Sequence, residues 1–130
     1  MRKLLGSLPL FLLINAAAFA ANPYPAISQD ELKQAIAGKS VVLLDANGSD
    51  SYKSGHIPGA IDFAANKDHL ASLLPANKSQ LVVAYCGGEK CTAYQAAAAA
   101  AAKLGYMNVR HFSPGISGWK QSGEKTEPGS

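Results

Sequence analysis

The stretch LVVAYCGGEKCT, residues 81–92, decides which fold this sequence can adopt. It opens with an apolar run, residues 81–85, of the kind that forms a strand buried inside a parallel sheet. That strand ends at Cys86, and a glycine-containing loop leads into an alanine-rich segment from Thr92. The stretch therefore predicts a strand, a loop and a helix in succession, with a nucleophilic side chain at the start of the loop.

The loop after Cys86 has a composition suited to holding an anion. Its members are Gly87, Gly88, Glu89, Lys90, Cys91 and Thr92. Glycines let the backbone curl so that successive N–H groups face one point, and the N-terminus of the following helix adds partial positive charge. Such surroundings favour the thiolate of Cys86, which is the form that attacks sulfur. Lys90 would reinforce this effect, whereas Glu89 would oppose it.

Cys86 and Cys91 are close enough in the sequence to form a disulfide across the loop. A purely structural disulfide would close a loop of about six residues and contribute about 2 kcal/mol, because so short a loop gains little from closure. It would also join a strand end to the adjacent helix start without connecting distant elements. A chemical use of the two thiols is the favoured interpretation, and the structural disulfide is the alternative.

The segments before this stretch begin with a helix and a strand. Ser28 and Glu31 form a capping box for a helix over residues 29–37. The continuous apolar run at residues 41–44 predicts a second buried strand. Asp45 is then placed at the C-terminal end of that strand, where its carboxylate could orient the loop or cap a turn; the structural role is favoured.

Shorter elements are predicted between the two strands. The polar residues 48–55 favour a loop or a short helical turn, and residues 57–61 lead into another short strand. Asn66 is expected to cap a further helix, which Pro75 ends.

The segments after the loop give one more helix and one more strand. Alanine is the best helix former, so a helix is predicted from Thr92 to residue 104, with Gly105 as its C-terminal cap. Residues 109–112 predict a last strand, followed by a glycine-rich turn and Trp119, which is expected to pack in the core. The polar tail over residues 121–130 is expected to fray.

Strands that alternate with helices predict an α/β domain of three layers, with a mainly parallel sheet covered by helices on both faces. Functional groups in such sheets gather at the C-terminal ends of the strands. Asp45 and Cys86 are both expected there.

The N-terminus has the layout of a secretory signal peptide. Arg2 and Lys3 precede an apolar run over residues 4–19, and small residues favour cleavage after Ala20. The apolar run is shorter than the roughly 20 residues that a membrane span needs. We therefore expect a signal peptide over residues 1–20 and a single periplasmic domain over residues 21–130, without a membrane span after cleavage.

The charge of the expected mature domain gives no sign of a nucleic-acid partner. Arg2 and Lys3 belong to the signal, which leaves ten of the twelve basic residues against nine acidic ones. No basic stripe with interleaved aromatic residues is present. Metal-ligand spacings such as C-x-x-C or H-x-x-x-H are also missing, so neither a metal nor another cofactor is expected.

Several motifs resemble those of the single-domain rhodanese family of sulfurtransferases. The most specific is the run GHIPGA at residues 55–60, which matches a motif of that family. Cys86 stands where the family's active-site cysteine ends a central strand. Residues 104–109 resemble the closing L-G-Y-x-N-V element, and residues 115–119 resemble the end of the G-G-I-x-x-W element. The resemblance covers about residues 28–121.

The resemblance implies a sulfurtransferase mechanism that centres on Cys86. Its thiolate would take sulfane sulfur from a small donor, thiosulfate or a persulfide, and hold it as a persulfide until a thiol acceptor removes it. Asp45 and His56 would support the site, with His56 shaping the turn of its motif rather than acting as a base. The spacing of the two cysteines, rather than the resemblance, suggests a further step: Cys91 could attack the Cys86 persulfide, expel hydrogen sulfide and leave a disulfide, which a thiol reductant protein would have to reopen.

Three positions depart from the family pattern. Asn47 and Cys91 stand where many members have arginines, and Pro114 replaces the first glycine of the closing element. Arginine binds anions with two parallel hydrogen bonds, so thiosulfate loses such a clamp at Cys91.

Three functions follow from these patterns. The first is a sulfurtransferase that uses a Cys86 persulfide. The second is a dithiol/disulfide exchange protein that uses Cys86 and Cys91 together. The third is a non-catalytic rhodanese-like binding module whose loop is locked by a disulfide.

Overall fold

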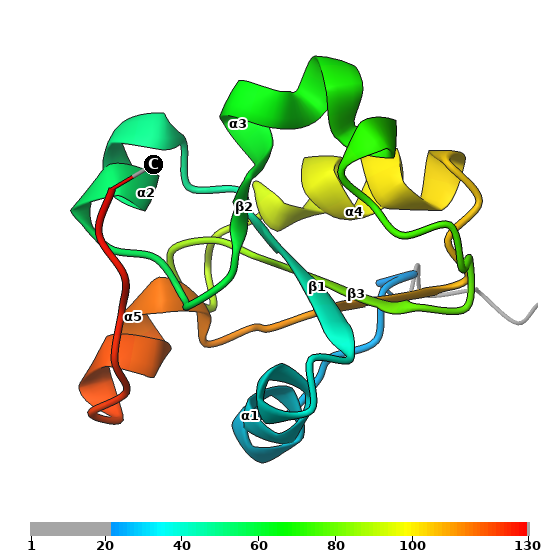
Figure 1. Cartoon of the computed structure of the whole chain (residues 1–130). Coiled ribbons are helices and arrows are strands. Elements are labelled where there is room, and N and C mark those ends of the chain that lie inside the picture. Colours follow the sequence, from blue (N-terminus) through cyan, green and yellow to red (C-terminus); the bar gives the residue numbers. More distant parts are fainter. Residues whose placement is uncertain (1–21, 130) are drawn as a thin grey trace, which may run out of the picture.

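The computed structural model describes residues 22–129, and its core is a four-stranded sheet in which all paired strands are parallel (Figure 1). The strand order is β2-β1-β3-β4. The strands are β1 (Val41–Asp45), β2 (Ile61–Asp62), β3 (Leu81–Tyr85) and β4 (Asn108–His111). β1 and β3 are neighbours in the middle of the sheet, and Asp45 pairs with Tyr85. The carboxyl ends of both central strands therefore meet at one edge.

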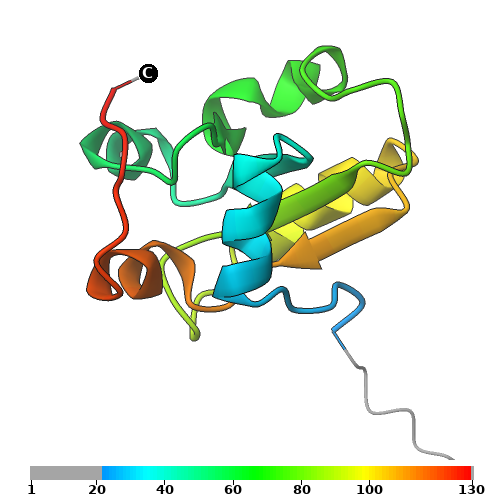
Figure 2. The same cartoon turned by 60° about the horizontal axis from the view of Figure 1, so that its bottom comes forward.

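Helices cover both faces of this sheet, as the three-layer α/β prediction requires. They are α1 (Gln29–Ala37), α2 (Ser49–Ser54), α3 (Phe63–Asn66), the 3₁₀ helix η1 (Lys67–Ser72), α4 (Tyr94–Lys103) and α5 (Gly115–Gln121). α3, η1 and α4 lie over one face, and α1 and α5 lie over the other (Figures 1 and 2). The predicted fold class is confirmed.

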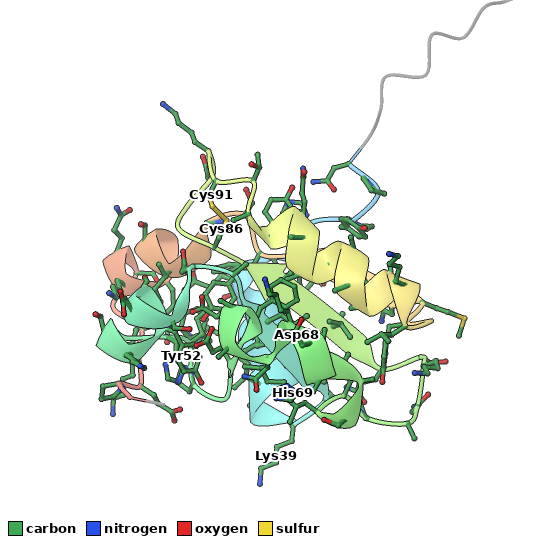
Figure 3. All side chains as sticks on the ribbon, turned by 90° about the horizontal axis from the view of Figure 1, so that it is seen from above. Lys39, Tyr52, Asp68, His69, Cys86 and Cys91 are labelled. Atoms are coloured by element: carbon green, nitrogen blue, oxygen red, sulfur yellow. A yellow bond between two sulfur atoms is a disulfide. The ribbon has the colours of Figure 1, made fainter. Side chains whose placement is uncertain are left out.

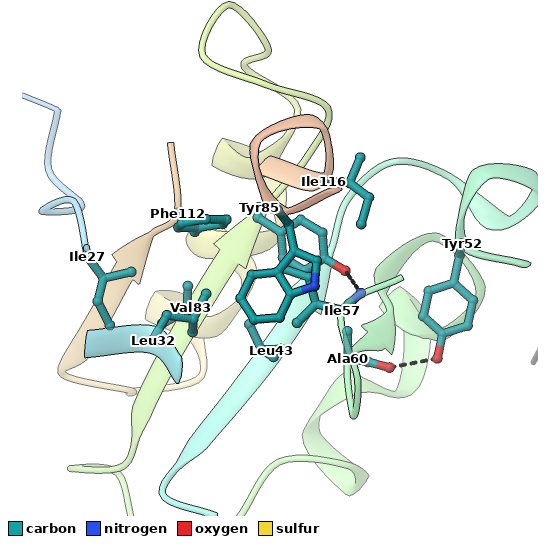
Figure 4. Packing of buried hydrophobic residues seen from close by; sticks show 11 residues of the cluster. Ile27, Leu32, Leu43, Tyr52, Ile57, Ala60, Val83, Tyr85, Phe112 and Ile116 are labelled. Atoms are coloured by element: carbon teal, nitrogen blue, oxygen red, sulfur yellow. Dashed lines mark hydrogen bonds between the residues drawn. The ribbon is translucent and has the colours of Figure 1, made fainter. Parts of the chain in front are cut away.

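Alternate residues of the strands build two separate cores. Val83 and Tyr85 of β3 join Leu32 of α1 in one cluster of buried side chains (Figure 4). Val82 and Ala84 point to the opposite face, where they pack against the alanines of α4. β3 is thus apolar on both faces, which explains its continuous apolar sequence.

The predicted helix over residues 29–37 is confirmed as α1. The Ser28 hydroxyl accepts a hydrogen bond from the Glu31 N–H at 3.1 Å and donates to the Glu31 carboxylate at 3.2 Å. Leu32 is fully buried against the sheet. The cap and the apolar face together fix where the helix starts and which side it buries.

Helix α4 begins two residues later than predicted and ends as predicted. Tyr94 is its first residue, because the preceding turn is tighter: the Gln95 N–H donates to the Thr92 carbonyl. At the other end, Gly105 has φ +96° and follows the cap residue. The N–H groups of Gly105 and Tyr106 donate to Ala102 and Ala101, which closes a Schellman motif.

The helix predicted from Asn66 to Pro75 is wrong in its start and its regularity. The side chain of Asp62, not of Asn66, caps the segment by accepting from the Ala65 N–H at 3.3 Å. A single α turn then gives way to η1, which is kinked at His69 with φ −135°. The break leaves Leu73 44% exposed. Leu70 and Leu74 are buried in the cluster beside α4 while Leu73 is not, so the three leucines do not share one buried face as a regular helix would require.

The region after β4 differs most from the sequence prediction. Residues 115–121 form α5 rather than a turn, although two glycines lower its helix propensity, because Ile116 and Trp119 are buried on one face. Trp119 packs in the core as predicted, with its ring edge against Phe112.

The tail beyond α5 is ordered through Gly129, so the predicted fraying is wrong for the described part. Glu127 exchanges two backbone hydrogen bonds with His56, each 2.9 Å long. The Gly129 N–H donates to the Lys53 carbonyl at 2.9 Å. Tertiary hydrogen bonds hold a polar segment that has no apolar periodicity of its own.

The signal peptide predicted over residues 1–20 lies outside the described residues. Among residues 22–129, no helix is long and apolar enough to cross a membrane.

Candidate active site around Cys86

Cys86 lies directly after β3, at the edge where the two central strands end (Figure 3). Its side chain is only 2% exposed. Asp45 ends the neighbouring strand at the same edge and is also buried. The structure therefore brings the two predicted residues to one end of the sheet, as the parallel topology requires.

Helix α5 holds the first part of the cysteine loop in place. The N–H of Ile116 donates to the Cys86 carbonyl at 2.9 Å, and the N–H of Ser117 donates to the Gly87 carbonyl at 3.0 Å. Gly115 has φ +61°, and a Cβ there would collide with the Cys86 carbonyl oxygen and lie 2.7 Å from the Gly88 nitrogen. A glycine is therefore required for α5 to approach the loop this closely.

These contacts also determine which way the loop amides face. In a trans peptide the N–H points opposite to the preceding carbonyl, so the N–H groups of Gly87 and Gly88 point away from α5. Within residues 22–129, neither these groups nor the N–H groups of Glu89 and Lys90 donate to a protein acceptor. Within that part of the chain these N–H groups are therefore free, and the anion-holding role of the loop stays a prediction.

Cys86 and Cys91 form a disulfide across the loop in the structure (Figure 3). Their Cα atoms are 6.2 Å apart, within the range that disulfides require. The N–H of Cys91 also donates to the Gly88 carbonyl at 3.0 Å, which closes a turn inside the loop. This turn within the loop brings Cys91 back toward Cys86, while α5 fixes the start of the loop.

An open hollow of about 720 Å³ lies beside the loop. It is lined on one side by residues 87–91 and on the other by Pro114, Ser117, Gly118 and Gln121. The first of these four residues immediately precedes α5, and the other three belong to it. Except for the side chains of Glu89 and Lys90, the lining is uncharged, so the hollow offers hydroxyl, amide and backbone groups rather than a fixed cationic clamp.

The charged and terminal residues of the loop lie at its rim. Glu89, Lys90 and Thr92 are exposed. Neither charged side chain forms an ion pair among the described residues. Thr92 does not cap α4 through its side chain. The loop therefore presents one charge of each sign to solvent.

Asp45 fixes the entrance of the loop through Tyr85. One carboxylate oxygen accepts from the Tyr85 hydroxyl at 2.8 Å, and the other accepts from the Asn47 N–H at 2.8 Å. The Tyr85 hydroxyl accepts in turn from the Ile57 N–H at 3.0 Å. Burial, assisted by the Asp45 charge, raises the pKa of Tyr85 far above its ordinary range, so the phenol stays a donor. These contacts match the structural role favoured for Asp45.

Asn47, which stands where the resemblance to the rhodanese family implies an arginine, lies beside the loop. Its amide oxygen would be 3.6 Å from a Cβ placed on Gly87. Its amide nitrogen is buried and has no hydrogen-bond partner among the described residues. A short, neutral amide thus takes the place of a long cation next to the cysteine loop.

His56 shapes its own turn and makes no contact with the cysteine loop. Its ring stacks on Tyr52 with 3.7 Å between the ring centroids, and its Nδ1 lies 2.8 Å from the Tyr52 carbonyl oxygen. Its Nε2 is 3.8 Å from a carboxylate oxygen of Glu127. These contacts fit the role in shaping the turn that the motif implies.

Sequence reasoning missed the contribution of α5 to the site. Ser117 and Gln121 line the hollow, and neither belongs to a motif that suggested a functional role. The available signal was Gly115: a glycine before an apolar residue, near the end of the domain, can mark a close approach between backbones. No group of three or more potential metal ligands occurs among residues 22–129.

Comparison with known proteins identifies the fold and the family. Residues 28–122 match the model of the rhodanese-like domain. The rhodanese-like domain of a protein from Anabaena is 26% identical, with a TM-score of 0.63 over 80% of this chain and 79% of that one. Thiosulfate sulfurtransferase from Pseudomonas aeruginosa is 25% identical, with a TM-score of 0.64 over 82% of this chain and 21% of that one.

A curated relative is similar to most of this chain over half of its own length. An HTH-type transcriptional regulator of Mycobacterium tuberculosis is 31% identical over 118 residues, which are 89% of this chain and 50% of that protein. This chain therefore spans about half the length of that relative. The matched model covers most of the chain, including β1 to β4 and the Cys86 loop. The chain belongs to the family of rhodanese-like domains.

Proposed function

We propose that this protein is a periplasmic sulfurtransferase that carries sulfane sulfur as a persulfide on Cys86. The observation that carries the proposal is the position of Cys86 at the end of β3, in a loop whose amide N–H groups have no protein acceptor among residues 22–129. Similarity to a thiosulfate sulfurtransferase supports the same chemistry. Membership of the rhodanese-like family by itself supports only the broader class, a sulfurtransferase of unspecified donor.

The first half of the reaction loads sulfur onto the reduced protein. The Cys86 thiolate attacks the outer sulfur of a donor such as thiosulfate or an organic persulfide; a new S–S bond forms, and the donor's own S–S bond breaks. The donor remnant leaves with the electron pair, as sulfite or as a thiolate. Free loop amides would stabilise the anionic persulfide and the departing anion.

The second half delivers the sulfur. An acceptor thiolate attacks the outer sulfur of the persulfide, and Cys86 leaves as the thiolate, ready for the next cycle. The hollow is lined by the loop residues that follow Cys86, so it gives an acceptor room to approach the loop, and the outer sulfur of the persulfide extends beyond the buried Cys86 side chain. No metal or organic cofactor enters either step.

The lining of the site supports an organic persulfide over thiosulfate as the donor. Thiosulfate is a dianion, and Arg-type clamps bind such groups through paired hydrogen bonds. Here Asn47 and Cys91 stand at the two positions where the resemblance to the family implies arginines, and the exposed Glu89 offsets Lys90. A donor with a neutral or extended body would lose less binding affinity than thiosulfate when these two arginines are absent.

Intact mass after sulfur loading tests the proposal. The protein is reduced, freed of reductant and incubated with thiosulfate or with glutathione persulfide, and a parallel sample is left oxidised. We expect a gain of one sulfur atom in the reduced sample only, because the disulfide occupies Cys86 in the other. The gain should disappear in Cys86→Ser. An unchanged mass with both donors would contradict the proposal.

Dithiol/disulfide exchange is the second candidate, and the Cys86–Cys91 disulfide favours it. Exchange needs both thiols, whereas sulfur loading needs only Cys86. In Cys91→Ser, disulfide exchange with a model dithiol should therefore fail while sulfur loading persists. A protein indifferent to both substitutions would fit the third reading, a rhodanese-like binding module.

Export to the periplasm is part of the proposal and rests on the first 20 residues. The full chain would be expressed in a Gram-negative host and recovered by osmotic release of the periplasm. Sequencing of its N-terminus should then begin at Ala21. Recovery of the uncleaved chain in the cytoplasmic fraction would contradict the proposed export but not the proposed sulfurtransferase activity.

A further inference from the structure

We propose that Cys91 is the resolving thiol of the site: it attacks the Cys86 persulfide, releases hydrogen sulfide and leaves the loop disulfide. This inference rests on the proposed persulfide at Cys86 and adds a second activity to it. It converts a sulfur carrier into a protein that reduces sulfane sulfur to sulfide. The support comes from how the loop backbone holds the two cysteines.

The cysteines are kept close by hydrogen bonds that do not depend on the disulfide. The carbonyls of Cys86 and Gly87 are bound by α5, so the start of the loop is fixed. At its other end, the Cys91 N–H donates to the Gly88 carbonyl. Since these bonds involve backbone atoms only, reduction leaves both thiols on the same turn. A thiol held in this way reacts as if it were highly concentrated.

The loop geometry also selects which sulfur Cys91 attacks. The disulfide joins the Sγ atoms of Cys86 and Cys91, so the backbone can bring Cys91 Sγ to the inner sulfur of a Cys86 persulfide. Attack on that atom forms the Sγ–Sγ bond and breaks the bond to the outer sulfur. Attack on the outer sulfur would only move the persulfide to Cys91.

The step balances without any external oxidant. The outer sulfur leaves with the electron pair of the broken bond and takes up the proton of the Cys91 thiol, so the anionic persulfide and the thiol give the disulfide and HS⁻. The outer sulfur is reduced to sulfide, and the two cysteine sulfurs together supply its two electrons by becoming a disulfide. A dithiol reductant then restores Cys86 and Cys91 and is itself oxidised to a disulfide.

The different burial of the two cysteines determines which sulfur of the disulfide the reductant attacks. Cys86 is 2% exposed, whereas Cys91 is half-buried and lines the open hollow. An incoming thiolate therefore reaches the sulfur of Cys91 first, and Cys86 is the leaving group. The partner dithiol would form its mixed disulfide with Cys91.

A single-turnover experiment tests the inference. Reduced wild-type protein and Cys91→Ser, both freed of reductant, receive one equivalent of glutathione persulfide. Sulfide is measured by its methylene blue product, and the protein by intact mass. We expect the wild type to release one sulfide per chain and to end two hydrogens lighter than the reduced form. Cys91→Ser should instead retain one added sulfur, with sulfide at the level of Cys86→Ser.

The outcomes separate this inference from the proposed function. If both proteins retain the added sulfur, the persulfide forms but Cys91 does not resolve it, and only the inference fails. If both release sulfide equally, Cys91 is again not the resolving thiol. If neither gains sulfur nor releases sulfide, the persulfide itself is absent and both proposals fail. A far-UV circular dichroism spectrum of Cys91→Ser that matches the wild type shows that this variant is folded.

Discussion

Tyr85 connects three segments at the entrance of the cysteine loop. Its hydroxyl donates to Asp45 at the end of β1. It accepts from the N–H of Ile57 in the GHIPGA motif, as Figure 4 shows. All three residues are buried. One phenol therefore fixes the residue before Cys86 relative to the neighbouring strand and to the motif that marks the family.

Replacing Tyr85 with phenylalanine should destabilise the domain by about 1–3 kcal/mol, because a buried carboxylate oxygen and a buried N–H both lose their partner. The free energy of unfolding in urea measures this change. Tyr94→Phe is the matched control: its hydroxyl lies on the surface, where it contacts Asn22, so its effect should stay within about 0.5 kcal/mol. Equal effects of the two substitutions would refute the role given to Tyr85.

Gly115→Ala should both destabilise the protein and impair sulfur loading. Alanine at φ +61° costs about 1–2 kcal/mol, and its Cβ would in addition collide with the loop at Cys86 and Gly88. Gly123→Ala is the control that separates backbone strain from collision. Its φ is +83°, but nothing lies within 4 Å of the added Cβ. Urea unfolding and mass-detected loading should show the larger loss for Gly115→Ala. Normal loading in that variant would argue against the α5 contact.

At the scale of elements, α4 shows how its sequence fits its place in the fold. Ala97, Ala98 and Ala101 are completely buried against the sheet. Small side chains allow the helix axis to approach β3 closely, so the alanine run serves packing as well as helix propensity. The run was identified as a helix from its composition, but the composition does not show which alanines face the sheet.

Ala98→Leu should cost about 1–3 kcal/mol, because three extra carbon atoms must be fitted into a closely packed layer. Ala99→Leu adds the same atoms on the exposed side of α4 and should change stability by no more than about 0.5 kcal/mol. The thermal unfolding midpoints of the two variants are compared with that of the wild type. A shift of similar size in both would mean that α4 does not pack as described.

At the scale of the whole molecule, the C-terminal tail closes the domain. Glu127 pairs with His56 in a short antiparallel bridge, and the indole N–H of Trp119 donates to the Lys125 carbonyl at 2.8 Å. The tail therefore links α5, which holds the cysteine loop, to the turn that carries the GHIPGA motif. A segment far from Cys86 in the sequence thus supports the geometry of its loop.

Removal of residues 124–130 should lower the urea midpoint, because the buried Trp119 indole and the His56 backbone lose their partners. A lost buried hydrogen bond costs about 1–3 kcal/mol. Glu124→Gln is the control: it removes only the partly exposed surface ion pair with Lys33 and leaves the backbone bonds intact, so the midpoint should change little. A truncated protein as stable as the full chain would show that the tail is dispensable.

The sequence by itself determined the α/β class, the position of Cys86 after a central strand and the extent of α1. These features are local: apolar runs, a capping box and a glycine stop each act through neighbours in the chain. The motif at residues 55–60 indicated the family that the comparisons then showed. It also marked the turn around His56, although the partners of that turn lie elsewhere.

Only the tertiary structure decided what surrounds the cysteine loop. α5 and the ordered tail have weak local signals, since two glycines and a run of polar residues favour neither helix nor strand. Their conformations are stabilised by burial of Ile116 and Trp119 and by hydrogen bonds to Cys86, Gly87 and His56. Contacts between residues distant in the chain depend on three-dimensional packing, which local patterns do not encode.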